Sequence, residues 1–278
     1  MQIHPVPDPG ALAEFYRRDY RREGFNAAVD PGLFPWDCRN RLSRGRSLRL
    51  FAERHSRLAD DARILEIGAG FGHNLAAFRE TRPRCLLVAS EVDPSCRVTL
   101  SKLGGALIEG DWSAADARRA IAARGPFDLI LVVHVLEHPA APGQFLRSVR
   151  SVLAPDGRVI LEVPGESPRA VRTSNNAPHI CFFEAPSLAR FLENHGGRVL
   201  ALDSCGPRVT EPRSPLKRLV LRRAPAGLIR RVWRRKAPAS VRIPLTPEEV
   251  ADRDRVPIPF YDEYGGERIW LRAFATFG

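Results

Sequence analysis

The chain has 278 residues, 44% of them hydrophobic, and a formal net charge of +11. This length and composition can bury a substantial core, as one large domain or as one domain with an appendage. No run of about 18 apolar residues occurs, which excludes a membrane-spanning helix. The first residues, Met1 to Pro7, lack the charged and then apolar pattern of a signal peptide. We therefore expect a cytoplasmic protein.

The five cysteines are scattered along the chain and odd in number, without Cys-x-x-Cys spacing: Cys38, Cys85, Cys96, Cys181 and Cys205. Such spacing is typical of free thiols rather than of a disulfide framework or a zinc site. We therefore expect no bound metal.

The first sixty residues have a helical pattern on both sides of an irregular stretch. Apolar and aromatic residues recur at helical spacing over 11–22 and again over 41–58, and residues 26–40 are rich in proline and aromatic side chains. Such a leading segment is either a lid over a ligand site or a packed extension.

From residue 63 onward, short apolar runs alternate with helical patterns. Strands are predicted at 64–67, 86–90, 106–108, 127–133, 158–163 and 199–202, and helices at 74–80, 94–103, 114–123, 142–153 and 184–194. Near-continuous apolar strands that alternate with helices are typical of a parallel sheet covered on both faces. The last segment, 268–274, alternates polar and apolar residues, as an edge strand does.

A turn with three glycines follows the first of these strands. Gly68, Gly70 and Gly72 lie between a strand and a helix, where a ligand can approach bare backbone and the positive end of the helix dipole. The spacing is Gly-x-Gly-x-Gly, with Glu66 two residues before the first glycine. A site for NAD would have Gly-x-Gly-x-x-Gly, so the pattern favours another cofactor.

Five stretches in order resemble the motifs of class I S-adenosylmethionine-dependent methyltransferases. They are residues 65–72 (LEIGAGFG), 88–94 (VASEVDP), 109–112 (EGDW), 127–138 (FDLILVVHVLEH) and 153–158 (LAPDGR). The resemblance covers roughly residues 60–203. It implies an α/β fold, a Rossmann-like three-layer sandwich with a seven-stranded, mostly parallel sheet whose last strand is antiparallel.

The same resemblance divides the chain into four segments. They are an N-terminal helical lid or extension at 1–60, a methyltransferase core at 61–207, a basic and proline-rich insertion at 208–265, and a final core strand at 266–278.

The resemblance implies S-adenosylmethionine as cofactor and assigns roles to the residues of these motifs. Glu66 would orient the glycine turn and help to receive the ammonium group, and Glu91 would accept both ribose hydroxyls. Asp93 is alternatively a helix cap before Pro94. Asp111 would take the adenine amino group. The predicted cofactor-binding residues are Glu66, Gly68, Ala69, Gly70, Gly72, Asn74, Glu91, Val92, Asp93, Gly110, Asp111, Trp112 and His134. Of these, Trp112 could equally be a core residue.

Methyl transfer is an in-line displacement in which proximity contributes most, and an oxygen nucleophile also benefits from a general base. His134 and His138 follow the fourth strand, and His179 belongs to a His-x-x-Phe-Phe segment that resembles small-molecule methyltransferases. We predict His179 or His138 as the base, with His134 as a third candidate. His138 is alternatively a helix-start residue, and Glu137 could simply orient a neighbour.

The resemblance therefore predicts O-methylation of a small molecule, a sugar or a lipid-linked glycan. No Asn/Asp-Pro-Pro-Tyr/Phe motif and no cysteine follow the fourth strand, which argues against methylation of base amino groups and of cytosine carbon 5. The alternatives are an RNA or protein methyltransferase that uses the basic surface, and a non-catalytic cofactor-binding protein on the same fold.

Much of the positive charge lies between residues 208 and 236, where arginine pairs alternate with apolar pairs. This pattern favours peripheral contact of residues 215–236 with an anionic membrane over a track for nucleic acid. A solvated helix pair packed on the domain is the alternative.

Overall fold

The computed structural model describes residues 2, 6–18, 39–165, 179–208, 247–248, 264–266 and 268–278. Residues 215–236, for which we expect membrane contact, lie outside the described residues, as does almost all of the predicted loop at 26–40. The structure therefore bears on the sheet, its covering helices and the cavity between them.

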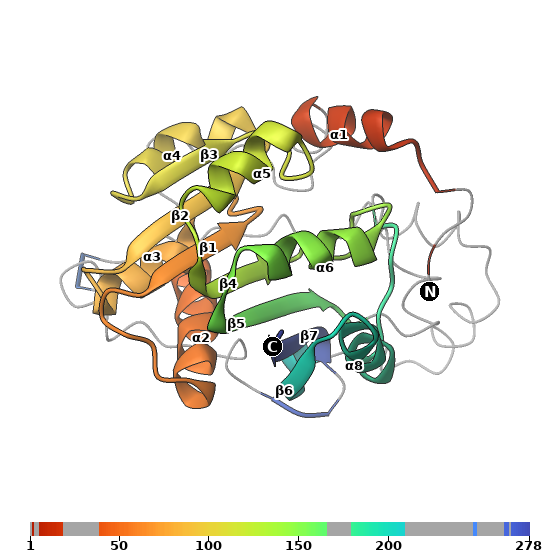
Figure 1. Cartoon of the computed structure of the whole chain (residues 1–278). Coiled ribbons are helices and arrows are strands. Elements are labelled where there is room, and N and C mark those ends of the chain that lie inside the picture. Colours follow the sequence, from red (N-terminus) through yellow and green to blue (C-terminus); the bar gives the residue numbers. More distant parts are fainter. Residues whose placement is uncertain are drawn as a thin grey trace, which may run out of the picture.

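Seven strands of the described chain form one central sheet (Figure 1). Their order across the sheet is β3-β2-β1-β4-β5-β7-β6. Strands β1 to β5 pair in parallel, and β7 runs antiparallel to both of its neighbours. The strands are β1 Arg63–Ile67, β2 Leu86–Glu91, β3 Ala106–Glu109, β4 Phe127–Val133, β5 Leu153–Pro164, β6 Arg198–Arg208 and β7 Arg268–Thr276. The predicted fold class is confirmed.

The prediction that the last segment is an edge strand was wrong. β7 lies between β5 and β6, and β6 takes the edge. The alternation of Arg268, Trp270 and Arg272 with apolar residues suggests a half-exposed strand, but Arg272 is fully buried beside a carboxylate. Its charge is compensated inside the protein rather than by water.

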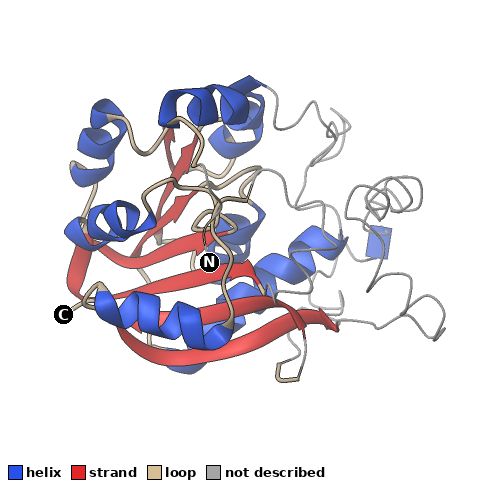
Figure 2. Cartoon of the chain, turned by 90° about the vertical axis from the view of Figure 1, so that its right-hand side faces the viewer, coloured by secondary structure: helices blue, strands red, loops and turns tan. Residues whose placement is uncertain are grey.

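Helices cover both faces of the sheet and make three layers (Figures 1 and 2). One core cluster joins the sheet to α5, α6 and α8, and the other joins it to α2, α3 and α4. The helices are α1 Pro9–Arg18, α2 Arg39–His55, α3 His73–Thr81, α4 Arg97–Ser101, α5 Ala115–Ala122, α6 Pro142–Ser151 and α8 Ala185–Asn194. The single helix predicted at 94–103 is a 3₁₀ turn, Pro94–Cys96, followed by the short α4.

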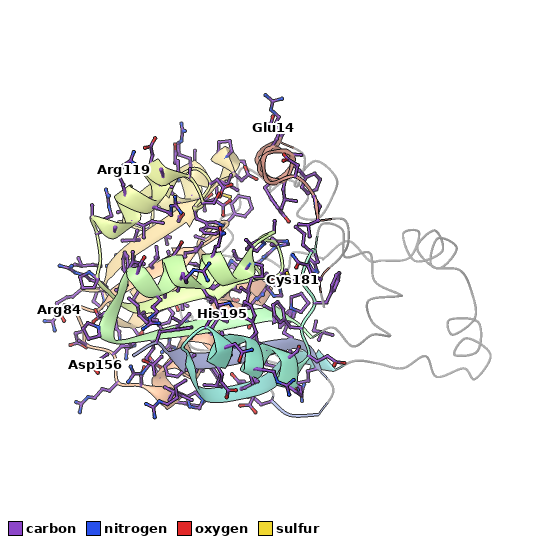
Figure 3. All side chains as sticks on the ribbon, turned by 45° about the vertical axis from the view of Figure 1, so that its right-hand side comes forward. Glu14, Arg84, Arg119, Asp156, Cys181 and His195 are labelled. Carbon is purple, nitrogen blue, oxygen red and sulfur yellow. The ribbon has the colours of Figure 1, made fainter. Side chains whose placement is uncertain are left out.

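Many charged side chains lie on the molecular surface, while the thiols of the described residues lie inside. Arg84, Arg119 and Asp156 are exposed and extend outward (Figure 3). The four cysteines in the described ranges are free and buried, and Cys38 lies outside those ranges. In the part of the chain that the structure describes, no helix combines the length and the apolar character needed to cross a membrane.

The glycine turn is hydrogen-bonded to the end of β2. The backbone N–H groups of Gly68 and Ala69 both donate to the carbonyl of Ser90, at 2.8 and 3.1 Å. Gly68 has a φ of 70°, which favours glycine. A Cβ atom added there would lie 2.5 Å from Cγ2 of Val135, in the turn after β4. Gly68 therefore permits both the backbone conformation and a close approach between two neighbouring strand ends.

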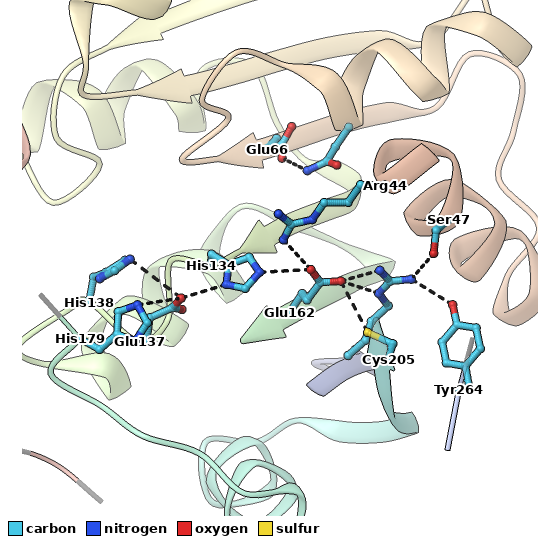
Figure 4. A network of polar contacts seen from close by, with 12 residues as sticks. Arg44, Ser47, Glu66, His134, Glu137, His138, Glu162, His179, Cys205 and Tyr264 are labelled. Atoms are coloured by element: carbon cyan, nitrogen blue, oxygen red, sulfur yellow. Dashed lines mark hydrogen bonds and ion pairs between the residues drawn. The ribbon is translucent and has the colours of Figure 1, made fainter. Parts of the chain in front are cut away.

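A buried ion pair joins β5 to β7. Arg272 and Glu162 are both fully buried, and Nη2 of Arg272 lies 2.5 Å from the carboxylate (Figure 4). Arg44 of α2 approaches the other oxygen at 2.7 Å. Arg272 also donates to Ser47 and Tyr264, each at 3.0 Å. Burial alone would raise the pKa of Glu162, but the two arginines outweigh it and hold that pKa well below its usual range.

Removal of one partner from this pair should destabilise the fold strongly. Arg272→Met should lower the free energy of unfolding by about 3–5 kcal/mol, because it leaves the Glu162 carboxylate buried with weaker compensation. Arg97→Met is the matched control: its pair with Glu109 is largely exposed and screened by solvent, so its loss should cost far less than the loss of Arg272. Urea denaturation of the two variants measures both values. An equal loss of unfolding free energy in the two variants would contradict the strong stabilising role of the buried Arg272–Glu162 pair.

The close approach at Gly68 can be separated from its backbone strain. Gly104 has a φ of 67° with open space around it, so Gly104→Ala measures the strain alone, about 1 kcal/mol. Gly68→Ala should cost about 1–3 kcal/mol more, because the stiff Val135 side chain must move. Adding Val135→Ala should reduce that excess. A double variant as unstable as the sum of its parts would show that Val135 is not the obstacle.

Candidate active site

A cavity of about 540 Å³ opens at the carboxyl ends of the parallel strands. The turns after β1, β2, β3 and β4 form its walls, together with α1, α2, His179 and Trp270. β1 lies between β2 and β4, so the strand order reverses at this point, where sheets of this class bind ligands. The cavity is therefore the candidate active site.

Almost all of the predicted cofactor-binding residues line this cavity. They are Glu66, Gly68, Ala69, Gly70, Asn74, Glu91, Val92, Asp93, Gly110, Asp111, Trp112 and His134. Gly72 does not belong to the lining. A Cβ atom there would meet Leu103 and Leu100 at 2.6 and 2.8 Å, so this glycine lets the turn pack on the end of α4.

Glu66 sits at the base of the cavity beside α3. The side chain is 1% exposed, and Asn74 donates to its Oε1 at 2.6 Å. Burial raises the pKa of Glu66 to about 8, although the Asn74 hydrogen bond acts in the opposite direction. The carboxyl group therefore holds a proton at neutral pH unless a cation comes next to it.

Glu91 connects the turns after β1 and β2. Its Oε2 accepts a hydrogen bond from the backbone of Gly70 at 2.6 Å, and its Oε1 accepts one from the backbone of Asp93 at 2.9 Å. Asp93 accepts from the N–H of Ser95 at 2.8 Å and caps the turn that begins at Pro94, which confirms the predicted cap. Of these two carboxylates, Glu91 is thus the one held between the two turns.

Beyond β3, Asp111 and Trp112 form the far wall of the cavity. Asp111 accepts a hydrogen bond from the backbone of Ser113 at 2.8 Å. Trp112 packs edge-on against Phe145 with ring centroids 4.4 Å apart. Trp112 contacts the core and also lines the cavity, and its contact with the cofactor stays a prediction.

The three histidines predicted as catalytic candidates meet around one buried carboxylate (Figure 4). Glu137 is 1% exposed. Its Oε1 lies 3.3 Å from Nδ1 of His134, 3.9 Å from Nε2 of His138 and 4.0 Å from Nε2 of His179. Burial would raise the pKa of Glu137, but the three histidines outweigh it and lower that pKa. Glu137 is therefore ionised at neutral pH.

His134 lies between the carboxylates of Glu137 and Glu162. Its Nδ1 faces Glu137 and its Nε2 lies 3.3 Å from Oε1 of Glu162. Burial and Arg44 would lower the pKa of His134, but the two glutamates outweigh them and raise it. Two flanking carboxylates favour the imidazolium form of this ring, so His134 is suited to positioning Glu137 rather than to taking a proton from an acceptor.

Several cavity residues carried no signal in the sequence. Tyr16 of α1 hydrogen-bonds Nδ1 of His138 at 2.7 Å across 122 residues of chain. Arg44 of α2 stacks at 4.5 Å from the centroid of the Trp270 ring. His73, predicted only as a first helical turn, lines the cavity, and burial followed by Arg41 holds its pKa well below the usual range. No family motif includes Tyr16 or Arg44, because distant segments bring them to the cavity, whereas His73 directly follows the glycine turn.

Comparison with known families gives a match over more than half of the chain. Residues 39–202 match a family model described as a methyltransferase domain. A curated relative, a ubiquinone biosynthesis O-methyltransferase from Caulobacter sp. (strain K31), is 34% identical over 103 residues. That match covers 36% of this chain and 39% of the relative, so the chain spans well under half of the relative's length.

Solved structures share the fold. A 1,6-didemethyltoxoflavin-N1-methyltransferase from Burkholderia thailandensis superposes with a TM-score of 0.53 at 17% identity, covering 99% of this chain and 92% of that one. A coclaurine N-methyltransferase superposes with a TM-score of 0.51 at 13% identity, covering 84% and 70%. With the family match and the glycine turn at the sheet's switch point, the chain belongs to the class I S-adenosylmethionine-dependent methyltransferases.

Proposed function

We propose that the protein transfers a methyl group from S-adenosylmethionine to an oxygen of a small molecule, a sugar or a lipid-linked glycan. The observation that carries this proposal is the cluster of His138 and His179 around the Glu137 carboxylate, in the same cavity as the glycine turn. An oxygen nucleophile must lose a proton, and imidazoles held by a carboxylate are suited to that step. The O-methyltransferase activity in the curated relative's name is consistent with it.

The cofactor would lie along the β1, β2 and β3 side of the cavity. The backbone at Gly68 and Gly70 would face the methionyl and ribose parts, and Glu91, already held between two turns, would accept the ribose hydroxyls. Asp111 and Trp112 would hold the adenine. Glu66 would meet the ammonium group, which its buried position favours once the carboxyl loses its proton.

The acceptor would lie on the opposite side, between α1, the turn after β4 and β7. Leu12 and Tyr16 of α1 and Trp270 of β7 give this wall an apolar and aromatic character. The cavity volume of about 540 Å³ lies within the range of about 300–1,000 Å³ that small-ligand sites occupy. An aromatic or sugar ring, free or at the end of a larger molecule, suits such a wall.

The reaction is a displacement at the methyl carbon. Bound S-adenosylmethionine would supply an electrophilic methyl carbon: a bond from the acceptor oxygen would replace the carbon–sulfur bond, whose electron pair would return to sulfur, with S-adenosylhomocysteine as the second product. The hydroxyl proton passes to His138 or His179, whose imidazolium Glu137 would stabilise. His134, fixed between Glu137 and Glu162, keeps the Glu137 carboxylate in place.

Glu66 should release a proton when the cofactor binds. At pH 6.5 its carboxyl is protonated in the free protein, because burial raises its pKa to about 8. The cofactor's ammonium group favours the carboxylate, so binding should release about one proton, and affinity should rise as pH increases from 6 to 8. Calorimetry with S-adenosylhomocysteine in buffers of different ionisation enthalpy counts these protons.

Two variants control this measurement. Glu66→Gln keeps an acceptor for Asn74 and should abolish the proton release, whereas Glu91→Gln should weaken binding and leave the release unchanged. Equal proton release by the wild type and Glu66→Gln would show that another group titrates.

The histidines can be tested by activity against a panel of acceptors. We expect turnover of phenols, catechols, sugars or lipid-linked glycans, measured as S-adenosylhomocysteine formed. Alanine substitution of the histidine that accepts the proton, His138 or His179, should lower kcat by about 10²–10⁴-fold with cofactor affinity unchanged, because this group acts on the acceptor's proton. His55→Ala, which changes an exposed histidine far from the cavity, is the control. Methylation confined to amines, RNA or protein side chains would contradict the proposal.

A further inference from the structure

We propose that Glu137, His138 and His179 form a binding site for one divalent transition-metal ion, with Zn²⁺ as the preferred class of ion. The three residues each offer one ligand atom, and these atoms all lie within 4.8 Å of one another. The spacing of the cysteines predicted no metal, but none of these three ligands is a cysteine. The fold creates the cluster by bringing the segment after β5 against the turn after β4.

The geometry is close to that of a bound ion. Oε1 of Glu137 lies 3.9 Å from Nε2 of His138 and 4.0 Å from Nε2 of His179. Ligand atoms of a tetrahedral zinc site, each about 2.0–2.2 Å from the ion, lie roughly 3.2–3.6 Å apart. Both distances from Glu137 exceed this range by only a few tenths of an ångström. The backbone already holds the two segments together, because Ile180 and Cys181 both donate to the carbonyl of Glu137, at 2.8 and 2.9 Å.

A buried charge at the centre of the cluster points to a cation. Glu137 is 1% exposed, and its Oε2 accepts no hydrogen bond from the described residues. A buried carboxylate of this kind is costly unless a positive charge or further donors satisfy it. Nδ1 of His134 lies 3.3 Å from Oε1 of Glu137 and compensates part of this charge. A divalent ion between the carboxylate and the imidazoles of His138 and His179 would compensate it more completely.

The surroundings of His138 fit a metal ligand. Coordination through Nε2 leaves the ring proton on Nδ1, which would then donate to the hydroxyl of Tyr16 at 2.7 Å. Metal-binding histidines regularly use their second nitrogen in this way, and the contact fixes both the tautomer and the ring orientation. His134, on the other side of Glu137, would serve as an outer partner of the carboxylate.

The ligand set indicates the class of ion. Two imidazoles and one carboxylate suit Zn²⁺ and neighbouring first-row ions better than Mg²⁺ or Ca²⁺, which prefer oxygen ligands. All three residues also line the cavity, so a fourth coordination position faces the space proposed for the acceptor. Three protein ligands with an open position are typical of a catalytic zinc site.

The role of such an ion rests on the proposed O-methylation, although the binding site itself does not. An ion here would lower the pKa of an acceptor hydroxyl placed at its open position, so the hydroxyl proton could leave to solvent. His138 and His179 would then act as ligands, and the ion would replace them as the activating group.

Metal binding can be measured without any acceptor. We expect the purified, chelator-treated protein to bind one Zn²⁺ per chain by calorimetry, and Co²⁺ to give visible absorption bands typical of low coordination number. Glu137→Gln and His179→Ala should each weaken Zn²⁺ binding by more than about 100-fold, since loss of an outer partner alone typically costs 10–100-fold. Tyr16→Phe should weaken it by about 10- to 100-fold.

Controls separate this site from adventitious binding. His55→Ala removes an exposed imidazole elsewhere and should leave the affinity unchanged, and Mg²⁺ should not compete. Circular dichroism shows whether each variant is folded, and the three substitutions lie in separate segments, so a folded variant should be available. Absence of stoichiometric Zn²⁺ binding, or equal binding by the wild type and a folded His179→Ala, would overturn the proposal.

Zn²⁺ binding and methyl transfer, measured separately, distinguish failure of the metal-site proposal from failure of the proposed O-methylation. Zn²⁺ binding that depends on Glu137 without turnover of any hydroxyl acceptor would support the site and contradict the proposed function. Turnover of a hydroxyl acceptor that survives chelation, by a protein that binds no Zn²⁺, would support histidine as base and contradict the ion.

Discussion

The structure depends on one buried carboxylate, Glu162. Without compensation, a charge at this depth would cost several kcal/mol, so residues from other parts of the chain must meet it there. Arg272 comes from β7, Arg44 from α2 and His134 from the turn after β4. The same contacts bind α2 to the sheet and bring its arginine to the edge of the cavity. Arg44 and His134 therefore compensate the Glu162 charge and also form part of the cavity wall.

From Glu162 a line of alternating carboxylates and imidazoles leads into the cavity (Figure 4). His134 contacts Glu162 with one nitrogen and Glu137 with the other, and Glu137 in turn faces His138 and His179. The inner end of this line is closed by arginines, and its outer end opens on the cavity. A carboxylate anchored on one side and open on the other can stabilise a proton on imidazole or a metal ion. Both proposals for the reaction start from this asymmetry.

The two sides of the cavity are built in different ways. The side of β1, β2 and β3 consists of short turns directly after strands, held by backbone hydrogen bonds to Ser90 and Glu91. The opposite side consists of side chains from distant segments, including Tyr16, His179 and Trp270. The family shares a cofactor, so the first side can be identified from family motifs. The second side would decide the acceptor, and it depends on residues that the motifs do not include.

The sequence by itself determined the sheet, its helices and the cofactor side. Between residues 63 and 164 the local pattern and the tertiary environment largely agree, because strands buried on both faces are mostly apolar, and the residues predicted to bind the cofactor lie within a few positions of the strand ends. The pattern failed at β7, where Arg272 looks like a surface residue until Glu162 is placed beside it. Only the tertiary structure decided the histidine cluster. Glu137 appeared to be an orienting neighbour, and no local spacing indicates that His179 approaches it or that Tyr16 contacts His138, since contacts across 122 residues depend on how whole elements pack.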